Sequence, residues 1–490
     1  MRLFLVEHAR ALCICLLIFF LSAFSRAQVP LSALVSNNTG ACSARGVPAH
    51  CRSAFTGNRT RPSNVEAQTP IVNPVPGNVN FSDLHALFPL GTVSKILFHY
   101  QPWFESREHI SVGYEESDEA TVRNQIARMI ALGGYGMIVD WYGSRHPSQR
   151  HHLDATNVIA RYLNSCFPER CPLRMAIMED KGALSRQCPK GNKDQTSCLA
   201  ENLNADMDYI EKHYASRPWY LTQGDNPIVL FFLHEPDWQG SDWNRIWSEL
   251  KSHTSNYPHP FKFVFEEEDV KCWRHTQGDG CYVWMNPAKW SPTAQFFWGA
   301  SSNAKPVYYQ DFYKNAVANP DKIAIGAIKK GFDDNNASWG TNRVTAQQCG
   351  QTLLKTIGLI GTYYDSRHPI EFLGVPTWND YEEGSEVETG IDNCYTISVS
   401  ISGNVVSWSL NTTDSYASPA TIDHFTVYYG DARDNLYVVR DNIPVNTTSL
   451  DIAGLLPPGT WNIYVRMVAK PLFMNRMSQA VPYSTRAARR

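Results

Sequence analysis

Apolar runs alternate with helical patterns between residues 93 and 393, and this alternation predicts an α/β domain. Eight runs are continuously apolar, which is typical of parallel strands buried on both faces. They cover residues 95–103, 135–143, 172–180, 227–233, 261–267, 280–286, 322–328 and 371–378. Helical patterns separate several of them, at residues 117–134, 201–215, 242–253 and 345–365. Eight such units predict a TIM (β/α)8 barrel. A doubly wound open sheet is the alternative, although no glycine-rich phosphate loop follows the first run.

The pattern changes at Cys394 to an alternation of polar and apolar residues with period two. It covers residues 395–411, 423–431 and 459–470, without helical patterns between them. We therefore expect a small all-β sandwich over residues 394–490. Residues 455–468 resemble the late-strand region of fibronectin type III domains. This resemblance implies that Trp408 is the core tryptophan and Tyr464 the tyrosine-corner residue.

The N-terminus has the features of a secretory signal peptide over residues 1–27. Arginines precede the apolar run 11–24, and small residues occupy the −3 and −1 positions, Ser25 and Ala27. An uncleaved membrane anchor is the alternative interpretation. Residues 28–92 are rich in Ser, Asn, Pro and Thr without an apolar period, which predicts an irregular polar leader. The protein is therefore expected to be secreted, extracellular or periplasmic, with no membrane attachment after signal removal.

Cysteine usage agrees with secretion, because ten cysteines follow the signal segment and an even number favours disulfides. Their spacing favours local bridges, and the last pair follows by elimination. The expected pairs are Cys42–Cys51, Cys166–Cys171, Cys188–Cys198, Cys272–Cys281 and Cys349–Cys394. No cysteine or histidine cluster has zinc spacing, so we expect neither a metal nor another cofactor. The net charge of −3 over 490 residues gives no indication of a nucleic-acid partner.

In a TIM barrel the chemistry lies where the strands end, at the carboxyl face. Carboxylates and aromatic rings dominate the residues that follow the predicted strands, and both suit a sugar, whose C–H face stacks and whose hydroxyls donate. We predict a saccharide-binding set of His99, Gln101, Trp103, Asp140, Trp141, Tyr142, Glu179, Asp180, Glu266, Trp284, Asp333, Trp378 and Asn379. For each single aromatic residue, ordinary packing is the alternative.

The stretch PTWNDYEEGSEVETG, residues 376–390, crowds five carboxylates after the last predicted strand. Asp380 and Glu383 are three residues apart, which places them on one side of a helical turn. Two carboxylates in one site separate their pKa values, as the acid–base pair of a glycosidase requires. The alternatives are a calcium loop, with Asp380, Glu382 and Glu386 as ligands, and a solvated acidic loop.

The segment PTWNDYEEG resembles the Trp-Asn-Glu-Trp-x-Glu-Gly motif of glycoside hydrolase family 99 and the Trp-Asn-Asp-x-Gly-Glu motif of family 71. HYQPWF (99–104) and GYGMIVDWYG (134–143) resemble the first two strands of the family 99 type. The likeness spans residues 93–392. It implies hydrolysis of an α-linked glycan, α-mannan or α-glucan, with Glu383 as general acid and Asp380 as the second carboxylate.

Asp380 departs from family 99, which has Glu at this position, and agrees with family 71. A base that deprotonates the sugar 2-hydroxyl and a base that activates water are therefore both open. The rival hypothesis is a non-catalytic secreted glycan-binding or adhesion protein, which would keep the aromatic residues without the acid–base geometry. All candidate catalytic residues precede Cys394, so the C-terminal domain is expected to be dispensable for chemistry.

Overall fold

The computed structural model describes residues 78–88, 93–104, 109–145, 150–189, 191, 194–267, 271–285, 307–431 and 435–485. The predictions for the signal peptide, for most of the leader and for Cys42 and Cys51 lie outside these ranges. Within them, none of the helices combines the length and the apolar character needed to cross a bilayer.

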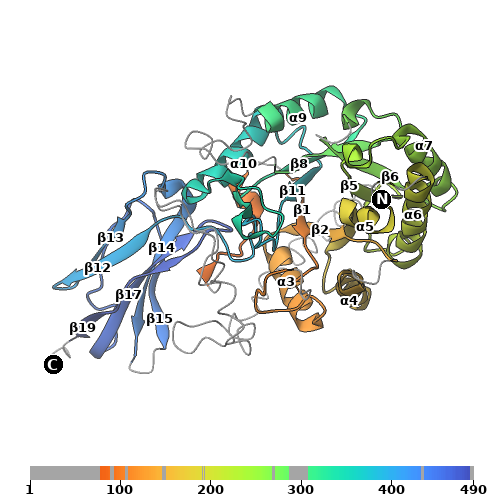
Figure 1. Ribbon diagram of the computed structural model, residues 1–490. Helices are drawn as coiled ribbons and strands as arrows, with labels where there is room; N and C mark the ends of the chain where they lie inside the picture. The colour runs from red at the N-terminus through yellow and green to blue at the C-terminus, as the bar shows by residue number, and fades with distance from the viewer. Residues whose placement is uncertain are drawn as a thin grey trace, which may run out of the picture. The chain divides into compact units, whose positions relative to one another are not determined.

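The eight predicted barrel strands are confirmed, and they form one closed parallel barrel (Figure 1). In chain order they are β1 Lys95–Tyr100, β2 Gly134–Trp141, β3 Arg174–Asp180, β5 Asn226–Phe232, β6 Lys262–Glu266, β7 Gly280–Tyr282, β8 Ile323–Ala327 and β11 Phe372–Val375. The circle closes through the pairs β1–β11 and β3–β5, which excludes the open sheet. A short strand β4, Thr222–Gln223, pairs antiparallel with β5.

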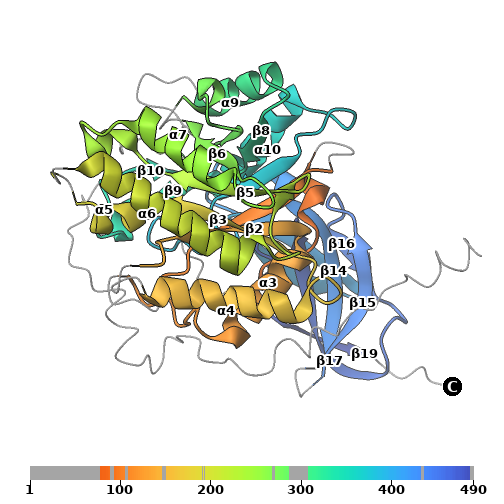
Figure 2. The same cartoon turned by 90° about the vertical axis from the view of Figure 1, so that its right-hand side faces the viewer.

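Helices lie around the outside of the barrel strands (Figures 1 and 2). They are α3 Glu119–Ala131, α4 Arg150–Cys166, α5 Lys181–Gln187, α6 Gln195–Ile210, α7 Trp243–Thr254, α9 Val307–Ala318 and α10 Gln351–Tyr363. Helices α4, α5 and α9 were not among the predicted ones. Helix α3 is capped by Asp118, whose carboxylate accepts from the backbone N–H groups of Ala120 and Thr121.

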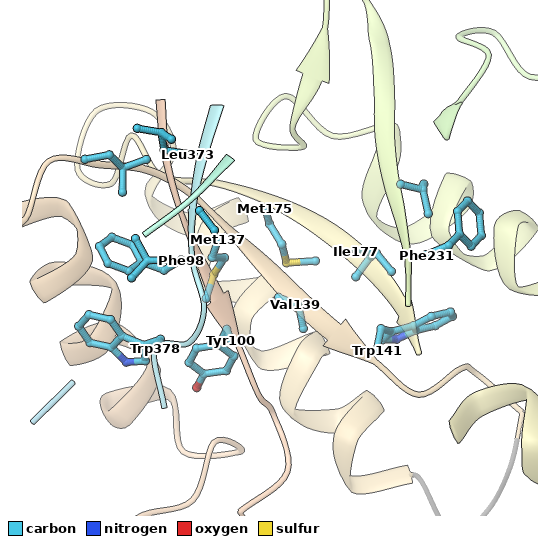
Figure 3. Close-up of a cluster of buried hydrophobic side chains, with 14 of the residues drawn as sticks. Phe98, Tyr100, Met137, Val139, Trp141, Met175, Ile177, Phe231, Leu373 and Trp378 are labelled. Carbon is cyan, nitrogen blue, oxygen red and sulfur yellow. The ribbon is translucent and has the colours of Figure 1, made fainter. Parts of the chain in front are cut away.

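Successive residues of each barrel strand face opposite sides, and this alternation decides which side chains can reach the centre. The inner core contains Leu97, Ile138 and Met178. The outer core, between strands and helices, contains their neighbours Phe98, Val139 and Ile177 (Figure 3). Residues of the inner parity at the strand ends therefore point into the carboxyl end of the barrel.

The C-terminal residues form two antiparallel sheets that share one hydrophobic core. The first contains β12 Thr396–Ser402, β13 Val405–Asn411 and β16 Ser449–Asp451; the second contains β14 Ile422–Gly430, β15 Leu436–Ile443, β17 Gly459–Ala469, β18 Arg476–Met477 and β19 Val481–Thr485. Trp408 lies in the core, as predicted. Tyr464 is half-buried on β17 between the core residues Ile463 and Val465, and its role as a tyrosine-corner residue stays a prediction.

One segment of the C-terminal region, residues 470–476, packs into the barrel domain. Leu472 and Phe473 belong to the outer barrel core, and Leu472 exchanges backbone hydrogen bonds with Asn80 and Ile391. The Phe473 ring occupies the space beside Gly350, where a Cβ would lie 2.0 Å from it; Gly350 also has a φ of +88°. The segment thus completes the core of the domain that precedes it.

Four of the predicted disulfides are present: Cys166–Cys171, Cys188–Cys198, Cys272–Cys281 and Cys349–Cys394. The first three close short local loops. The fourth ties the start of helix α10 to the chain that enters the C-terminal sheets. Together with Phe473, it holds the segment after β11 from two sides.

We predict that Phe473→Ala lowers the free energy of unfolding by about 3–5 kcal/mol, the usual cost of truncating a fully buried phenylalanine. Urea denaturation measures this loss. The control is Val438→Ala, which removes a valine that is 57% exposed and should cost less than about 0.5 kcal/mol. Equal stability of the two variants would contradict a structural role for the segment.

Candidate active site

Four carboxylates from three elements meet at the carboxyl end of the barrel. Asp140 is the penultimate residue of β2, Asp180 ends β3, and Asp380 and Glu383 follow β11. Burial raises the pKa of Asp140 well above its usual range, and the charges of Asp180, Asp380 and Glu383 raise it further. Because like charges repel at short range, the four groups cannot all be ionised at neutral pH. The site therefore holds protons in the resting protein.

Asp380 is fixed by the backbone of its own turn. Its Oδ1 accepts from the N–H groups of Glu382 at 3.1 Å and Glu383 at 2.9 Å. Its own N–H donates to Thr377 Oγ1 at 2.9 Å. The side chain is 1% exposed. Burial, and next the charge of Glu383, raise the pKa of Asp380 well above its usual range.

Glu383 is held through one of its two carboxylate oxygens. Its Oε1 lies 3.0 Å from Trp339 Nε1 and 3.6 Å from an Arg343 guanidinium nitrogen. Asp334 holds Arg343 through a 2.7 Å contact. Burial raises the pKa of Glu383, while Trp339 and Arg343 oppose the rise. With its side chain 14% exposed, Glu383 is more accessible than Asp380.

Tyr142 and Asp180 complete the acidic cluster. The Tyr142 hydroxyl donates to Asp140, and the tyrosine lies within the electrostatic reach of all four carboxylates. Asp180 caps helix α5, accepting from the backbone N–H of Gly182 at 2.5 Å. Burial raises the pKa of Asp180 to about 6. A hydroxyl-rich ligand would find both donors and acceptors here.

At the ends of β1 and β2, several side chains have buried polar atoms without a hydrogen-bond partner among the described residues. They are both ring nitrogens of His99, Gln101 Oε1, Trp103 Nε1 and Asp140 Oδ1. These side chains are between 1% and 4% exposed. Burial lowers the pKa of His99 to about 3, so its imidazole is neutral. Unpaired buried donors and acceptors are costly, which indicates that water or a polar ligand satisfies them.

Aromatic rings line the same end of the barrel. His99 packs edge-on against Trp284 with ring centroids 4.9 Å apart. Trp103 stacks on His109 at 4.6 Å and meets Trp339 edge to face at 5.8 Å. Flat apolar faces next to hydrogen-bonding groups are the combination that a sugar ring needs.

The other carboxylates of the acidic stretch hold the loop in place. Glu382 binds His109 Nδ1 at 2.6 Å, and Glu386 binds Lys330 Nζ at 2.6 Å with both side chains fully buried. Glu388 accepts from the hydroxyls of Tyr114 and Tyr381 at 2.7 and 3.0 Å. A solvated acidic loop is therefore excluded. Two of the ligands named for the calcium-loop alternative, Glu382 and Glu386, are engaged by His109 and Lys330 in this structure.

The structure corrects three of the predicted saccharide-binding residues. Trp141 and Trp378 lie in the outer core, between strands and helices (Figure 3). Trp378 packs on Phe98 at 5.3 Å and Trp141 on Tyr209 at 5.9 Å. Glu179 has the same outward parity as Trp141, its partner on β2. Strand alternation gives the reason for Trp141 and Glu179: at the end of a strand only every second residue faces the barrel centre. Trp378 lies beyond the end of β11, in the turn after Val375, and packs outward there.

Three further residues of the predicted saccharide-binding set are fixed by hydrogen bonds to the protein. Asn379 joins the loops after β1 and β11, because its side chain bonds both the N–H and the carbonyl of Gln101 at 2.8 and 2.9 Å. Glu266 points inward and accepts from the Tyr308 hydroxyl. Asp333 caps a short turn by accepting from Asn335 N at 3.1 Å.

The sequence interpretation missed Trp339, Arg343 and His109. None of them directly follows a strand, which was the criterion used. Trp339 and Arg343 lie in the stretch DDNNASWGTNRV (333–344), after β8. A long polar loop that carries a single tryptophan at the carboxyl end of a predicted barrel was the available signal.

The chain is similar in fold to several solved structures. It has 12% identity with the GH99 endo-α-mannosidase from Bacteroides thetaiotaomicron, covering 60% of this chain and 87% of that one, with a TM-score of 0.42. A glycoside hydrolase-like protein has 11% identity with this chain, covers 61% of this chain and 88% of its own, and has a TM-score of 0.44. A GH27 β-L-arabinopyranosidase from Geobacillus stearothermophilus has 11% identity, with 81% of this chain and 94% of that chain covered and a TM-score of 0.31. No protein-family model matches the chain. No curated protein sequence matches it either. The functional argument below therefore depends on the residues of the site.

We predict that Asp180→Asn stabilises the free protein at neutral pH. The folded-state pKa of about 6 lies above the unfolded value of about 3.9, so the folded protein binds a proton that the unfolded chain releases. The free energy of unfolding contributed by Asp180 therefore falls as pH rises through this window. The amide still caps α5 and does not titrate. We expect a gain of up to about 3 kcal/mol at pH 7.5, fading towards pH 4.

Urea denaturation at pH 4, 5.5 and 7.5 measures this gain. Asp154→Asn serves as the control, because its side chain is 56% exposed on helix α4. A stability difference between wild type and Asp180→Asn that is the same at all three pH values would show that Asp180 is not under electrostatic strain.

A second stability prediction concerns the buried ion pair. Lys330→Met leaves Glu386 buried without its cation and should cost about 3–5 kcal/mol. The double variant Lys330→Met/Glu386→Leu removes both charges and should recover most of that loss. Thermal unfolding of the single and double variants tests this. Equal destabilisation of both would mean that packing volume, and not charge pairing, explains the effect.

Proposed function

We propose that this protein is a secreted glycoside hydrolase that cleaves an α-linked glycan, with Asp380 and Glu383 as its acid–base pair. The observation that carries the proposal is the placement of these two interacting carboxylates beside buried polar atoms that lack partners. Such a site is costly for folding and suited to a polyhydroxyl ligand. The resemblance of PTWNDYEEG to the motifs of families 99 and 71 supports the same conclusion.

Glu383 acts as the general acid in this proposal. Its Oε1 is occupied by Trp339, so its Oε2 carries the proton and gives it to the glycosidic oxygen as the bond to the anomeric carbon breaks. Its greater exposure lets it reach the leaving sugar. His99 cannot take this role, because burial lowers its pKa to about 3 and its imidazole is therefore neutral, without an acidic proton to donate, at neutral pH.

Asp380 acts as the general base, accepting a proton from the group that attacks the anomeric carbon. That group is a water in an inverting reaction or the sugar 2-hydroxyl in the neighbouring-group reaction that family 99 implies. The charge of Glu383 raises the pKa of Asp380, so Asp380 ionises more readily when Glu383 carries the proton. One ionised and one protonated group is the state that the reaction needs.

The remaining inward residues bind the sugar. Asp140, Asp180 and Tyr142 accept from and donate to its hydroxyls, and Gln101 and His99 satisfy their unpaired atoms on the same ring. Trp103 and Trp284 offer apolar surface for its C–H face. In this proposal the substrate is α-mannan or α-glucan, as the resemblance implies.

The C-terminal sheets are proposed to be a fibronectin type III-like domain. Their two antiparallel sheets, of three and five strands, and the buried Trp408 support this. The four disulfides support export to an oxidising compartment. Because residues 470–476 pack into the barrel, the domain also contributes to the stability of the enzyme.

The experiment uses purified protein with α-mannan and α-1,3-glucan oligosaccharides and with the matching α-glycosyl fluorides. Glu383→Gln should lose about 10²- to 10⁴-fold in turnover of oligosaccharides. Its loss on fluorides should be much smaller, because fluoride leaves without a proton. Asp380→Asn should lose activity on both substrates, since both need the base.

Equal losses on the two substrates would remove Glu383 from the role of acid. A wild-type protein that binds oligosaccharides in calorimetry but releases no reducing ends would instead support the non-catalytic glycan-binding protein. The anomer of the first product, observed by NMR, separates inversion from retention.

A further inference from the structure

Trp339 combines two features that rarely occur in one side chain. Its indole N–H donates to Glu383 Oε1 at 3.0 Å, and yet its ring is 41% exposed. We propose that Trp339 is the stacking platform for the sugar on the leaving-group side of the cleaved bond, and that it orients Glu383 towards that sugar. This inference rests on the proposed function and adds a residue that determines substrate specificity.

The loop that carries Trp339 is rigid enough to present a platform. The Asp334 carboxylate accepts from the backbone N–H groups of Thr341 at 2.9 Å and Arg343 at 2.8 Å. At Gly340 a Cβ would lie 1.8 Å from the Asp334 carbonyl oxygen, so the turn closes too tightly for any other residue. An exposed indole on a loop fixed in this way has lost its conformational freedom before a ligand binds, which favours binding.

The surroundings of Trp339 indicate which part of the substrate it meets. The ring edge packs against Trp103 at 5.8 Å and against His109 at 5.7 Å. Trp103 is only 4% exposed and lies beside the buried unpartnered atoms. Of the two packed tryptophans, Trp103 is therefore buried and Trp339 is open to solvent. The sugar that reacts occupies the buried part, and Trp339 meets a sugar farther out.

The contact with Glu383 fixes the side on which this outer sugar lies. A general acid must touch the glycosidic oxygen, which joins the reacting sugar to the leaving sugar. A residue bonded to the acid and open to solvent therefore adjoins the leaving sugar. Stacking of that sugar on the indole would shield the Trp339–Glu383 hydrogen bond from water and keep the free oxygen of Glu383 aimed at the bond.

The inference requires that Trp339→Ala harms substrates that have a leaving sugar more than substrates that lack one. We expect kcat/KM for an α-linked oligosaccharide to fall about tenfold more than kcat/KM for the matching glycosyl fluoride, mainly through KM. The control, Tyr437→Ala, removes an aromatic ring that is 45% exposed on the C-terminal sheets and should treat both substrates alike.

Trp339→Phe separates the two roles, because it keeps an aromatic face and removes the N–H donor. We expect KM for the oligosaccharide to stay closer to wild type than in Trp339→Ala. The alkaline limb of the oligosaccharide pH–rate profile should move to higher pH, because a carboxylate that has lost a donor holds its proton more strongly.

If the wild type is active and Trp339→Ala loses equally on the oligosaccharide and the fluoride, the stacking platform is overturned and the proposed function stays intact. An unchanged alkaline limb in Trp339→Phe would overturn the orienting contact. Wild type that turns over neither substrate would overturn the proposed function and the subsite together.

Discussion

The structure after β11 depends on one electrostatic constraint: five carboxylates of one short loop are removed from water, and each must find a partner. Besides Glu383, which accepts from Trp339, three of them bind side chains from other elements. Glu382 binds His109, Glu386 binds Lys330, and Glu388 binds two tyrosine hydroxyls. These bonds fix the path of the loop. Asp380 and Glu383 are the other two carboxylates of the loop, and the charge of Glu383 raises the pKa of Asp380.

The loop is also held at its far end, by parts of the chain that are distant in sequence. The Cys349–Cys394 disulfide closes it against helix α10. The segment 470–476 hydrogen-bonds to Ile391 and places Phe473 against Gly350. A carboxylate pair in repulsion would relax by moving apart if its loop could move. The disulfide, the buried ion pair and the packed phenylalanine together resist that motion, so the fold stores the electrostatic strain that chemistry can use.

The sequence was sufficient for the barrel strands because their signals are local. Continuous apolar runs identified all eight barrel strands, and short cysteine spacings identified three of the four disulfides seen here. The candidate site was predicted less well, because the direction in which a side chain points depends on its exact position in or after a strand. Trp141 is one position from Asp140 on β2, so it faces the outer core, and Trp378 turns outward in the loop beyond β11, where strand alternation no longer applies. Trp339 could not be placed, since its contact with Glu383 spans 44 residues and depends on how a loop closes.

The two central carboxylates differ in what supports their ionised forms, and this difference explains how one pair can hold a mobile proton. Ionised Asp380 is supported by two backbone N–H groups, and ionised Glu383 by Trp339 and Arg343. When Glu383 is protonated, its charge no longer raises the pKa of Asp380, and the backbone donors favour the Asp380 carboxylate. When Asp380 is protonated, the indole and guanidinium favour the Glu383 carboxylate. The protein therefore stabilises both arrangements of a single proton. In the proposed reaction the substrate selects between them, because a glycosidic oxygen beside Glu383 accepts a hydrogen bond only from the first arrangement, and that is the arrangement in which Asp380 can act as a base.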